Sequence, residues 1–447
     1  MVQQAISTVL ETAKPEIDTQ NRNNKIENLK SWVETSIWTE RMLTALGNGV
    51  QGDKWYSLMD KVYNLRTLKA AWKRVASNKG AAGIDRISIN KFKAKEEIYL
   101  TEISKELKAK QYLPRAVRRV HIPKGNGKTR PLGIPTVKDR IVQMALKMVI
   151  EPIFEKEFLE MSYGFRPKRG CKDALREVDK LIKGGYTYIV DADISSYFDT
   201  IPHNKLMELI KDKISDSSVL KLIDNFLQQK IMDGLEEWTP IKGTPQGAVL
   251  SPLLANLYLH PLDVIITQAG YKMIRYADDF VIMCQNQKDS EAALELVKRW
   301  TQANGLNLHP DKTYIGNCSE SGQGFDFLGY RFEGGKRFVR TKSLKLLKDK
   351  IRQKTKRTRG DGIECIINSL NPMLKGWFEY FKHAGRQTFK DLDGFIRRRL
   401  RSILCRHNGI SVFGRSQAIH RRWPNIFFAK RGLFTLYEAH VLACQSR

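Results

Sequence analysis

The sequence predicts an α+β fold in which a small antiparallel sheet is combined with many helices. Three observations predict it. Short apolar runs bracket glycine or aspartate turns at residues 122–135 and 271–284, and a further apolar run ends in acids at residues 186–194, which is the pattern of strands and hairpins. Apolar residues recur at helical spacing between these runs and near the end of the chain. With 447 residues, the chain is long enough for several domains, each with its own core.

Charge separates this chain from an ordinary globular protein. Lysine and arginine number 76 against 48 aspartate and glutamate, a net charge of +28, which predicts a polyanionic partner. Most of the excess comes from residues 331–447, which hold 28 basic and 8 acidic residues. Aromatic residues are interleaved with these cations, whereas a disordered basic tail has few aromatics. We therefore expect a folded helical domain with a cationic face.

Several classes of protein are excluded by what the sequence lacks. Its six cysteines form no Cys-x-x-Cys pair, which argues against a disulfide scaffold or a zinc ribbon and suits a reducing compartment. No apolar run reaches the roughly 18 residues of a membrane span. The polar N-terminus has neither a signal core nor the composition of a transit peptide, and residues 1–54 are predicted to form a helical extension. We expect a cytoplasmic location and no membrane partner.

A basic hairpin is predicted at residues 122–135. Two strand-like pieces are joined by a Gly-Asn-Gly turn, and Lys124 and Arg130 are among its basic residues. Such a hairpin is able to lay cations along a triphosphate. An ordinary basic hairpin explains the pattern equally well when the segment is taken alone.

Acidic residues mark two further strands. The strand at 186–194 carries Asp193 near its C-terminal end, and residues 271–284 form a hairpin with Asp278 and Asp279 at or beside its turn. An isolated Asp-Asp pair is most often an exposed acidic turn. If the two strands are neighbours, however, three carboxylates meet, and magnesium is the counter-charge that carboxylate oxygens favour.

The remaining segments supply helices, loops and a final strand. Helices are predicted over residues 55–75, 137–159, 204–229, 249–258 and 290–304, loops over 163–167 and 242–247, and a hairpin strand over 325–332. Nucleotidyl transfer uses two metal ions about 4 Å apart, held by carboxylates from separated strands. It also needs cations for the phosphates. This sequence contains both the carboxylates and the cations.

Taken together, the residues resemble a known family, the group II intron reverse transcriptases with their maturase domain. Eight motifs in order carry the resemblance, at residues 78–85, 122–135, 163–167, 193–199, 244–247, 276–279, 308–313 and 327–330. Each is short, but eight in this order make a chance match improbable. The implied fold is a right-hand polymerase, with fingers at 55–185, a palm containing an antiparallel sheet at 186–335, and a helical thumb or maturase domain at 336–447.

The resemblance implies roles at the catalytic centre. Asp193, Asp278 and Asp279 match the catalytic, metal-binding aspartates, and Ile194 is included in the metal site. Asp193 and Asp278 are expected to be ligands of both metals, and Asp279, which points elsewhere along the strand, to hold metal less directly. The implied cofactor is a pair of Mg²⁺ ions, with Mn²⁺ as a substitute.

The resemblance also implies contacts with the substrates. Phe198 matches the aromatic residue that packs under the nucleotide sugar and rejects a 2′-hydroxyl, the alternative being a core aromatic. Lys124 and Arg130 look like the triphosphate contacts, and Gln246 lies beside the nascent base pair. Lys312 is a proton donor to the leaving pyrophosphate or, as an equal alternative, a phosphate or structural contact. The expected primer and template contacts are Tyr276, Phe327, Leu328, Gly329 and Tyr330.

The final third resembles the maturase domain, whose family role is to bind intron RNA and help it fold for splicing. Lys375, Arg397, Arg398 and Arg399 are its candidate RNA contacts. Many relatives continue into a DNA-binding segment and a nuclease with cysteine pairs. Cys405 with His407 is too little for such a zinc site, so target-strand cleavage is not expected.

The implied function is an RNA-directed DNA polymerase that also serves its group II intron as a splicing maturase and copies it during retrohoming. The expected partners are intron RNA, an RNA template with a DNA primer, deoxynucleoside triphosphates and target DNA, within a bacterial cytoplasmic ribonucleoprotein. Two alternatives stay open. One is a host-adopted reverse transcriptase with no intron of its own, and the other is an RNA-folding splicing factor with an inactive polymerase.

Overall fold

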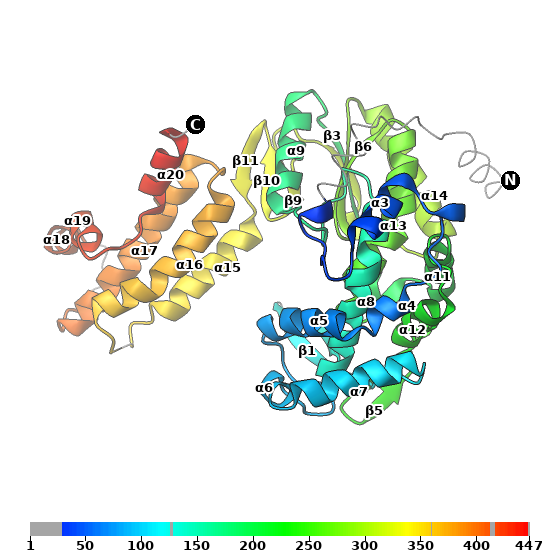
Figure 1. The fold of residues 1–447 in the computed structure, drawn as a ribbon. Helices are drawn as coiled ribbons and strands as arrows, with labels where there is room; N and C mark the ends of the chain where they lie inside the picture. Colours follow the sequence, from blue (N-terminus) through cyan, green and yellow to red (C-terminus); the bar gives the residue numbers. More distant parts are fainter. Residues whose placement is uncertain (1–28, 126–127, 359, 412–415, 446–447) are drawn as a thin grey trace. The chain divides into compact units, whose positions relative to one another are not determined.

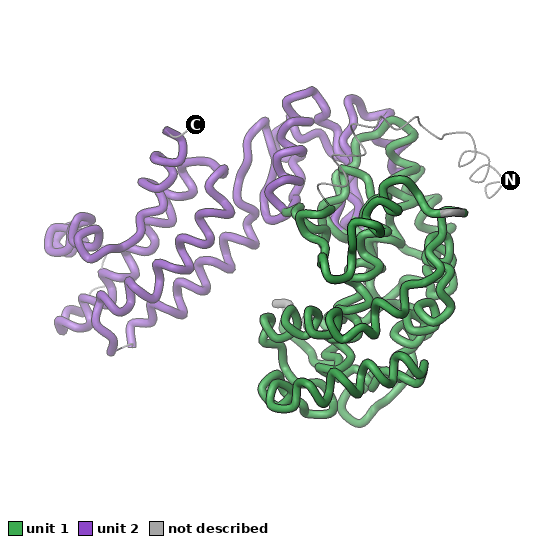
Figure 2. The backbone as a smooth tube through the Cα atoms, in the orientation of Figure 1, with its two compact units in different colours: residues 1–170, 193–278, 295–310 green, residues 171–192, 279–294, 311–447 purple. Residues whose placement is uncertain are grey.

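The computed structural model describes residues 29–125, 128–358, 360–411 and 416–445. The chain divides into two compact units (Figure 2): unit 1 contains residues 1–170, 193–278 and 295–310, and unit 2 contains residues 171–192, 279–294 and 311–447. The part of the predicted N-terminal extension at residues 1–28 lies outside the described residues. No described helix is long and apolar enough to cross a membrane.

Unit 1 is mostly helical. Its helices are α3 (Glu40–Asn48), η1 (Gln51–Asp53), α4 (Met59–Val62), α5 (Leu65–Ser77), α6 (Ile89–Lys93), α7 (Glu96–Lys108), α8 (Val137–Glu155), α10 (Tyr197–Thr200), α11 (His203–Lys211), α12 (Ser217–Leu227) and α13 (Ser251–Gln268), and its strands are β1 (Val117–Gly125), β2 (Lys128–Ile134), β4 (Ile231–Asp233), β5 (Glu236–Trp238) and β6 (Lys272–Tyr276).

Helix α8 is the central element of unit 1. Most of its residues are buried, and α4, α5, α7 and α13 pack against it; Figure 1 shows α5 and α7 on the same side of the unit as α8. The helix begins at a capping arrangement, in which the Thr136 hydroxyl accepts from the Asp139 backbone N–H (3.1 Å) and donates to the Asp139 carboxylate (2.7 Å). This arrangement supplies a partner to one of the N–H groups that a helix N-terminus leaves unpaired.

The predicted basic hairpin is confirmed, and it belongs to a larger sheet. Strands β1 and β2 pair antiparallel with Ile122 opposite Arg130, and the sheet order is β2-β1-β4-β5. β1 runs parallel to β4, and β4 returns as β5 after a two-residue turn at Gly234 and Leu235. The four strands of this sheet form part of the wall of a cavity beside Gln246.

Unit 2 contains strands from distant parts of the chain and a group of long helices. Its elements are α9 (Cys171–Lys183), β3 (Tyr188–Asp193), β7 (Asp279–Cys284), η2 (Pro310–Lys312), β8 (Tyr314–Asn317), β9 (Phe325–Phe327), β10 (Tyr330–Glu333), β11 (Lys336–Val339), α15 (Thr341–Lys354), α16 (Ile363–Phe381), α17 (Arg386–His407), α18 (Gln417–Arg422), α19 (Asn425–Ala429) and α20 (Leu436–Gln445). Helix α14 (Gln287–Ala303) begins in this unit and ends in unit 1. Figure 1 shows α15, α16, α17 and α20 lying side by side.

Two further sheets complete the α+β fold. One has the order β11-β10-β9, and the other has the order β6-β7-β3-β8. In the second sheet β3 and β8 pair antiparallel, with Tyr188 opposite Asn317. In this order the strand ending at Asp193 is a neighbour of the hairpin strand that starts at Asp279, which is the condition on which the three carboxylates were expected to meet.

Two predicted helices are each divided in two. The helix predicted over residues 55–75 is broken before Leu65, because the Asn64 side chain accepts from the Arg66 N–H (2.9 Å) and starts α5 afresh. The helix predicted over residues 204–229 is broken in the same way by Asp216, whose carboxylate accepts from the N–H groups of Ser218 and Val219. In both cases a local cap overrides a continuous apolar pattern.

Candidate active site

The end of β3 holds the first carboxylate in a defined place. The Asp193 carbonyl accepts from the His309 N–H (2.7 Å), and the Asn307 carbonyl accepts from the Ser195 N–H (2.8 Å). Between these bonds Ile194 forms an isolated bridge with Leu308, and its side chain is buried. Because that side chain faces the core, only the backbone carbonyl of Ile194 is available to a metal.

The second carboxylate lies in the turn between β6 and β7. Asp278 follows Ala277, which adopts a left-handed conformation at φ 61°. The Ala277 carbonyl accepts from the guanidinium of Arg275 (2.9 Å). Arg275 is fully buried and also donates twice to the Asp263 carboxylate (2.7 and 2.5 Å) and once to the side-chain oxygen of Asn256 (2.8 Å). The turn is therefore held from inside by a buried ion pair.

Electrostatics links the two carboxylates. Burial raises the pKa of Asp278, the nearby negative charge of Asp193 raises it further, and Arg130 and Arg275 oppose the rise. Two carboxylates that repel each other in a partly desolvated site are stabilised by a cation. Asp279 is the exposed first residue of β7 and belongs to unit 2. Among the described residues no three His, Cys, Asp or Glu side chains gather closely enough to form a metal site.

Phe198 follows Asp193 closely in the sequence. It lies in the short helix α10, which begins after Ser196 at φ 48°. The neighbouring Tyr197 is buried and its hydroxyl donates to the Ala255 carbonyl (2.5 Å). The Phe198 ring is half-buried, and its carbonyl accepts from the Thr244 N–H (2.7 Å). Phe198 is therefore tied to the loop that carries Gln246.

That loop is joined to the basic hairpin by close backbone contact. The Gln246 carbonyl accepts from the Gly133 N–H (2.7 Å). Gly247 has φ 103°, and a Cβ added there would lie 2.5 Å from the Gly133 carbonyl oxygen. Glycine is required at position 247 for both reasons, because L side chains rarely adopt this φ and no space is left for one.

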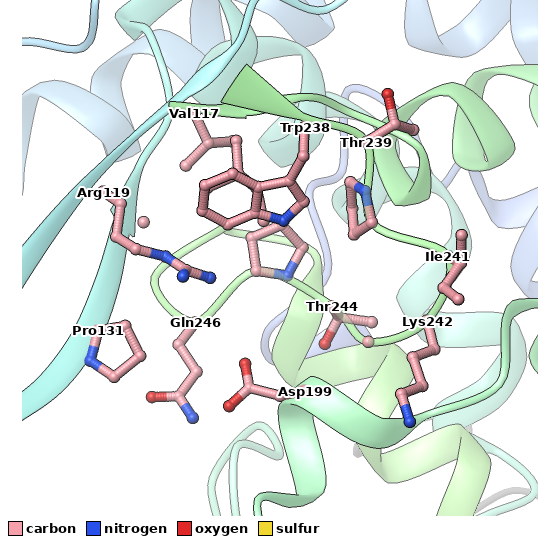
Figure 3. A pocket seen from close by; sticks show the side chains of 15 residues that line it. Val117, Arg119, Pro131, Asp199, Trp238, Thr239, Ile241, Lys242, Thr244 and Gln246 are labelled. Atoms are coloured by element: carbon pink, nitrogen blue, oxygen red, sulfur yellow. The ribbon is translucent and has the colours of Figure 1, made fainter. Parts of the chain in front are cut away.

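A cavity of about 400 Å³ opens beside Gln246 (Figure 3). Its walls are β1, β2, β4, β5, Asp199 and the loop 239–246. The Arg119 guanidinium lies 4.7 Å from the centre of the Trp238 ring. The hydroxyl of buried Thr244 has no hydrogen-bond partner among the described residues, and such a buried polar group is destabilising unless a ligand or water satisfies it.

Arg130 lies within electrostatic reach of both regions. Burial raises the pKa of Asp199, and the charges of Arg119 and Arg130 oppose the rise. Arg130 also opposes the rise that burial causes in the pKa of Asp278. The role of Arg130 at the triphosphate stays a prediction. Lys124 lies in β1 next to residues 126–127; its side chain, like those residues, lies outside what the structure describes, and its role stays a prediction.

The predicted primer contacts in unit 2 form a tight turn. Leu328 and Gly329, at φ 47° and 85°, connect β9 to β10, while the side chains of Phe327 and Tyr330 are buried. The Tyr380 hydroxyl donates to the Leu328 carbonyl (2.7 Å). A partner of this hairpin therefore meets the turn rather than the two aromatic rings. Tyr276 is the last residue of β6, and Lys312 is exposed in η2.

The candidate RNA contacts differ in how accessible they are. Lys375 is exposed on α16, whereas Arg397 and Arg398 are half-buried on α17. The Arg399 guanidinium donates to the Thr355 hydroxyl (2.7 Å) and the Thr355 carbonyl (2.6 Å). Burial lowers the pKa of Arg399, and the charges of Arg352 and Arg398 lower it further. Arg399 thus links α17 to the end of α15 within the bundle.

Sequence reasoning missed several residues that shape the site, notably Arg275, Asp263 and the cavity residues Arg119, Trp238 and Thr244. One signal was available. Arg275 interrupts the apolar run of a buried strand, and a charged residue in such a position needs a buried partner. The cavity had no comparable signal, because its walls come from several segments that are separated in the sequence.

Comparison with known proteins identifies the family of the chain. A family model for reverse transcriptase (RNA-dependent DNA polymerase) matches residues 122–332, and one for the maturase-specific domain of group II introns matches residues 344–423. Protein YkfC of Escherichia coli (strain K12) is 34% identical in an alignment of length 296, and the alignment covers 57% of this chain and 77% of YkfC. The group II intron-encoded protein LtrA of Lactococcus lactis subsp. cremoris is 40% identical over 208 residues, which are 46% of this chain and 34% of LtrA.

Among solved structures, a telomerase from Candida albicans aligns over 80% of this chain and 69% of that chain, with a TM-score of 0.41 and 12% identity. The mixed α+β fold and the family match define an RNA-dependent DNA polymerase domain. The chain belongs to the group II intron reverse transcriptases with a maturase domain.

Proposed function

We propose that this chain extends a DNA primer on an RNA template at a centre formed by Asp193 and Asp278, with Asp279 in a less direct role. The observation that carries the proposal is the sheet order, in which the strand that ends at Asp193 adjoins the strand that follows Asp278; the like charges of these two carboxylates act on each other. The proposal keeps the predicted division into fingers at 55–185, palm at 186–335 and thumb at 336–447.

The donor set fits magnesium. The carboxylates of Asp193 and Asp278, with the backbone carbonyl of Ile194, are hard oxygen ligands of the kind that Mg²⁺ or Mn²⁺ takes. When bound, such ions lower the pKa of the primer 3′-hydroxyl and stabilise the charge of the leaving pyrophosphate. The buried Arg275 holds the Asp278 turn in place, so that the carboxylate is positioned before substrate arrives.

The remaining residues hold the nucleotide and the template. Arg130, whose charge reaches Asp278, pairs with the triphosphate together with Lys124, and Lys312 contacts the leaving phosphates. The half-buried Phe198 ring lies under the sugar and excludes a 2′-hydroxyl. Gln246 contacts the nascent base pair, and the adjoining cavity receives a templating base against Arg119 and Trp238. The primer end lies at Tyr276 and the turn of Phe327, Leu328, Gly329 and Tyr330.

The second part of the proposal is RNA binding by the basic final third. The accessible cations of α16 and α17, including Lys375, Arg397 and Arg398, contact phosphates of a group II intron RNA and support its folding for splicing. Arg399 acts in this part by shaping the bundle. With splicing and copying in one protein, the chain serves retrohoming into target DNA from a cytoplasmic ribonucleoprotein.

Primer extension tests the catalytic assignment. Asp193→Ala and Asp278→Ala should each lower the rate of DNA synthesis on an RNA template by at least about 10³-fold, because each removes transition-state charge stabilisation worth several kcal/mol. Asp60→Ala, which removes an exposed acid of α4 in the same unit, is the matched control and should keep the wild-type rate. Extension at the wild-type rate by either test variant would show that the centre lies elsewhere.

A further inference from the structure

The loop at residues 163–167 carries an aromatic residue in a costly conformation. Phe165 has φ 59°, a region that bulky side chains adopt at a cost of about 1–3 kcal/mol and that is concentrated at functional sites. Its ring is 46% exposed, so burial of the ring does not account for the strain. Of the other described non-glycine residues with positive φ, Ser196 immediately precedes the Phe198 helix and Ala277 immediately precedes Asp278.

The rest of the loop is fixed firmly. Arg166 is 7% exposed, and its guanidinium pairs with Glu155 (2.8 Å) and donates to the carbonyls of Leu159 and Ser162 (2.5 and 2.7 Å). These bonds hold the residue that follows Phe165 within the core. The loop therefore has little freedom to relax the left-handed conformation of Phe165.

The residue before Phe165 is fixed against the catalytic turn itself. The Gly164 carbonyl accepts from the Asn256 side chain (2.7 Å), and a Cβ added at Gly164 would lie 2.2 Å from the Ala277 nitrogen. The Tyr163 N–H donates to the Arg275 carbonyl (2.8 Å). The loop backbone is thus in contact with the turn that presents Asp278.

This rigid loop directs Phe165 onto Phe198. The two rings meet edge to face, with centroids 6.4 Å apart and an angle of 78° between their planes. Edge-to-face aromatic pairs contribute about 0.5–1.5 kcal/mol beyond their buried area. Phe198 is only half-buried, so contact with the Phe165 ring restricts the positions that its own ring adopts.

We propose that Phe165 is a positioning residue for sugar selection: its ring holds the Phe198 ring where a ribose 2′-hydroxyl would collide. The inference rests on the proposed sugar-facing role of Phe198 and extends it to a residue outside that motif. The conformational strain at Phe165 is then the energetic cost of placing a second ring at the site. Ribonucleotides are rejected because Phe198 has no room to move away.

The test compares variants that separate strain from the ring. Phe165→Gly removes the ring and also relieves the left-handed backbone, so its melting temperature should equal or exceed that of the wild type. Phe165→Tyr keeps the ring at the same strained position. For each, kcat/KM is measured for one deoxynucleotide and its ribonucleotide on an RNA template with a DNA primer. Tyr56→Gly, at another exposed aromatic residue of unit 1, is the matched control. Phe198→Val tests the proposed contact of Phe198 with the nucleotide sugar.

The expected result is a fall of about tenfold in the deoxy-to-ribo ratio for Phe165→Gly, the lower end of what one pocket contact contributes to selectivity. The ratio should be unchanged for Phe165→Tyr and Tyr56→Gly. An unchanged ratio in Phe165→Gly alongside a lowered one in Phe198→Val would overturn this inference alone. An unchanged ratio in both would overturn the sugar-facing role of Phe198 and this inference with it.

Discussion

The buried ion pair behind the turn that carries Asp278 gives a quantitative prediction. Arg275 and Asp263 have side chains that are 0% and 5% exposed, and they share two hydrogen bonds of 2.7 and 2.5 Å. Removing one partner of a buried pair costs about 3–5 kcal/mol, since the other charge is left uncompensated. In Asp263→Ala the guanidinium keeps its bonds to Asn256 and Ala277, so we expect a loss near the lower limit, about 3 kcal/mol.

Urea unfolding followed by tryptophan fluorescence measures this loss, with the slope compared between variants to confirm that the same surface unfolds. The matched control is Asp224→Ala, which breaks a longer and more exposed pair with Lys221 (3.6 Å) in the same unit. An exposed pair contributes about 0–1 kcal/mol. Equal losses of unfolding free energy in Asp263→Ala and Asp224→Ala would refute the view that the buried Arg275–Asp263 ion pair stabilises the fold. If the view is right, Asp263→Ala also slows DNA synthesis, because Arg275 positions the Asp278 turn.

Two further predictions concern pH and salt. Burial raises the pKa of Asp139 from 3.8 to about 6, although hydrogen bonds from Thr136 and Tyr112 oppose the rise. Between these two pKa values the folded state keeps a proton that the unfolded state has lost. The stability of the folded state therefore falls as the pH rises from 4 through 6. The unfolding free energy of Asp139→Asn relative to wild type should accordingly rise by up to about 3 kcal/mol over that range and stay level above it, and a pH-independent difference in urea titrations would contradict this. The affinity of the final third for RNA should fall steeply as the salt concentration rises. Filter binding measures this affinity between 50 and 200 mM salt, a range over which the Debye length falls from about 14 Å to about 7 Å. An affinity that stays constant over this range would exclude an interface dominated by phosphate contacts.

Local patterns were enough to predict the strands that carry the acids. The hairpin at 271–284 has two apolar runs around aspartates, and the strand at 186–194 ends in acids, so both are defined by residues close in sequence. The sheet order shows that the two strands are neighbours; the sequence left this as a condition, because no local pattern encodes the pairing of strands that are far apart in the chain. The roles of the individual site residues remain predictions.

Other features were hidden because competing or distant interactions decide them. Asn64 and Asp216 interrupt apolar patterns that continue past them, and only their side-chain caps show where a new helix begins. The β4–β5 hairpin was missed although Asp233 and Gly234 form a turn dipeptide, because each strand has three residues and no clear alternation. The cavity beside Gln246 depends on a backbone contact with Gly133, which no local pattern encodes.

We propose that one chain combines a polymerase centre at Asp193 and Asp278 with a separate RNA-binding final third. The most direct measurement uses a single preparation of Asp278→Ala and assays both primer extension on RNA and splicing of the intron that flanks this reading frame. We expect DNA synthesis to be abolished while splicing proceeds at close to the wild-type rate. Loss of splicing together with synthesis in a variant that still folds, or continued synthesis, would contradict it.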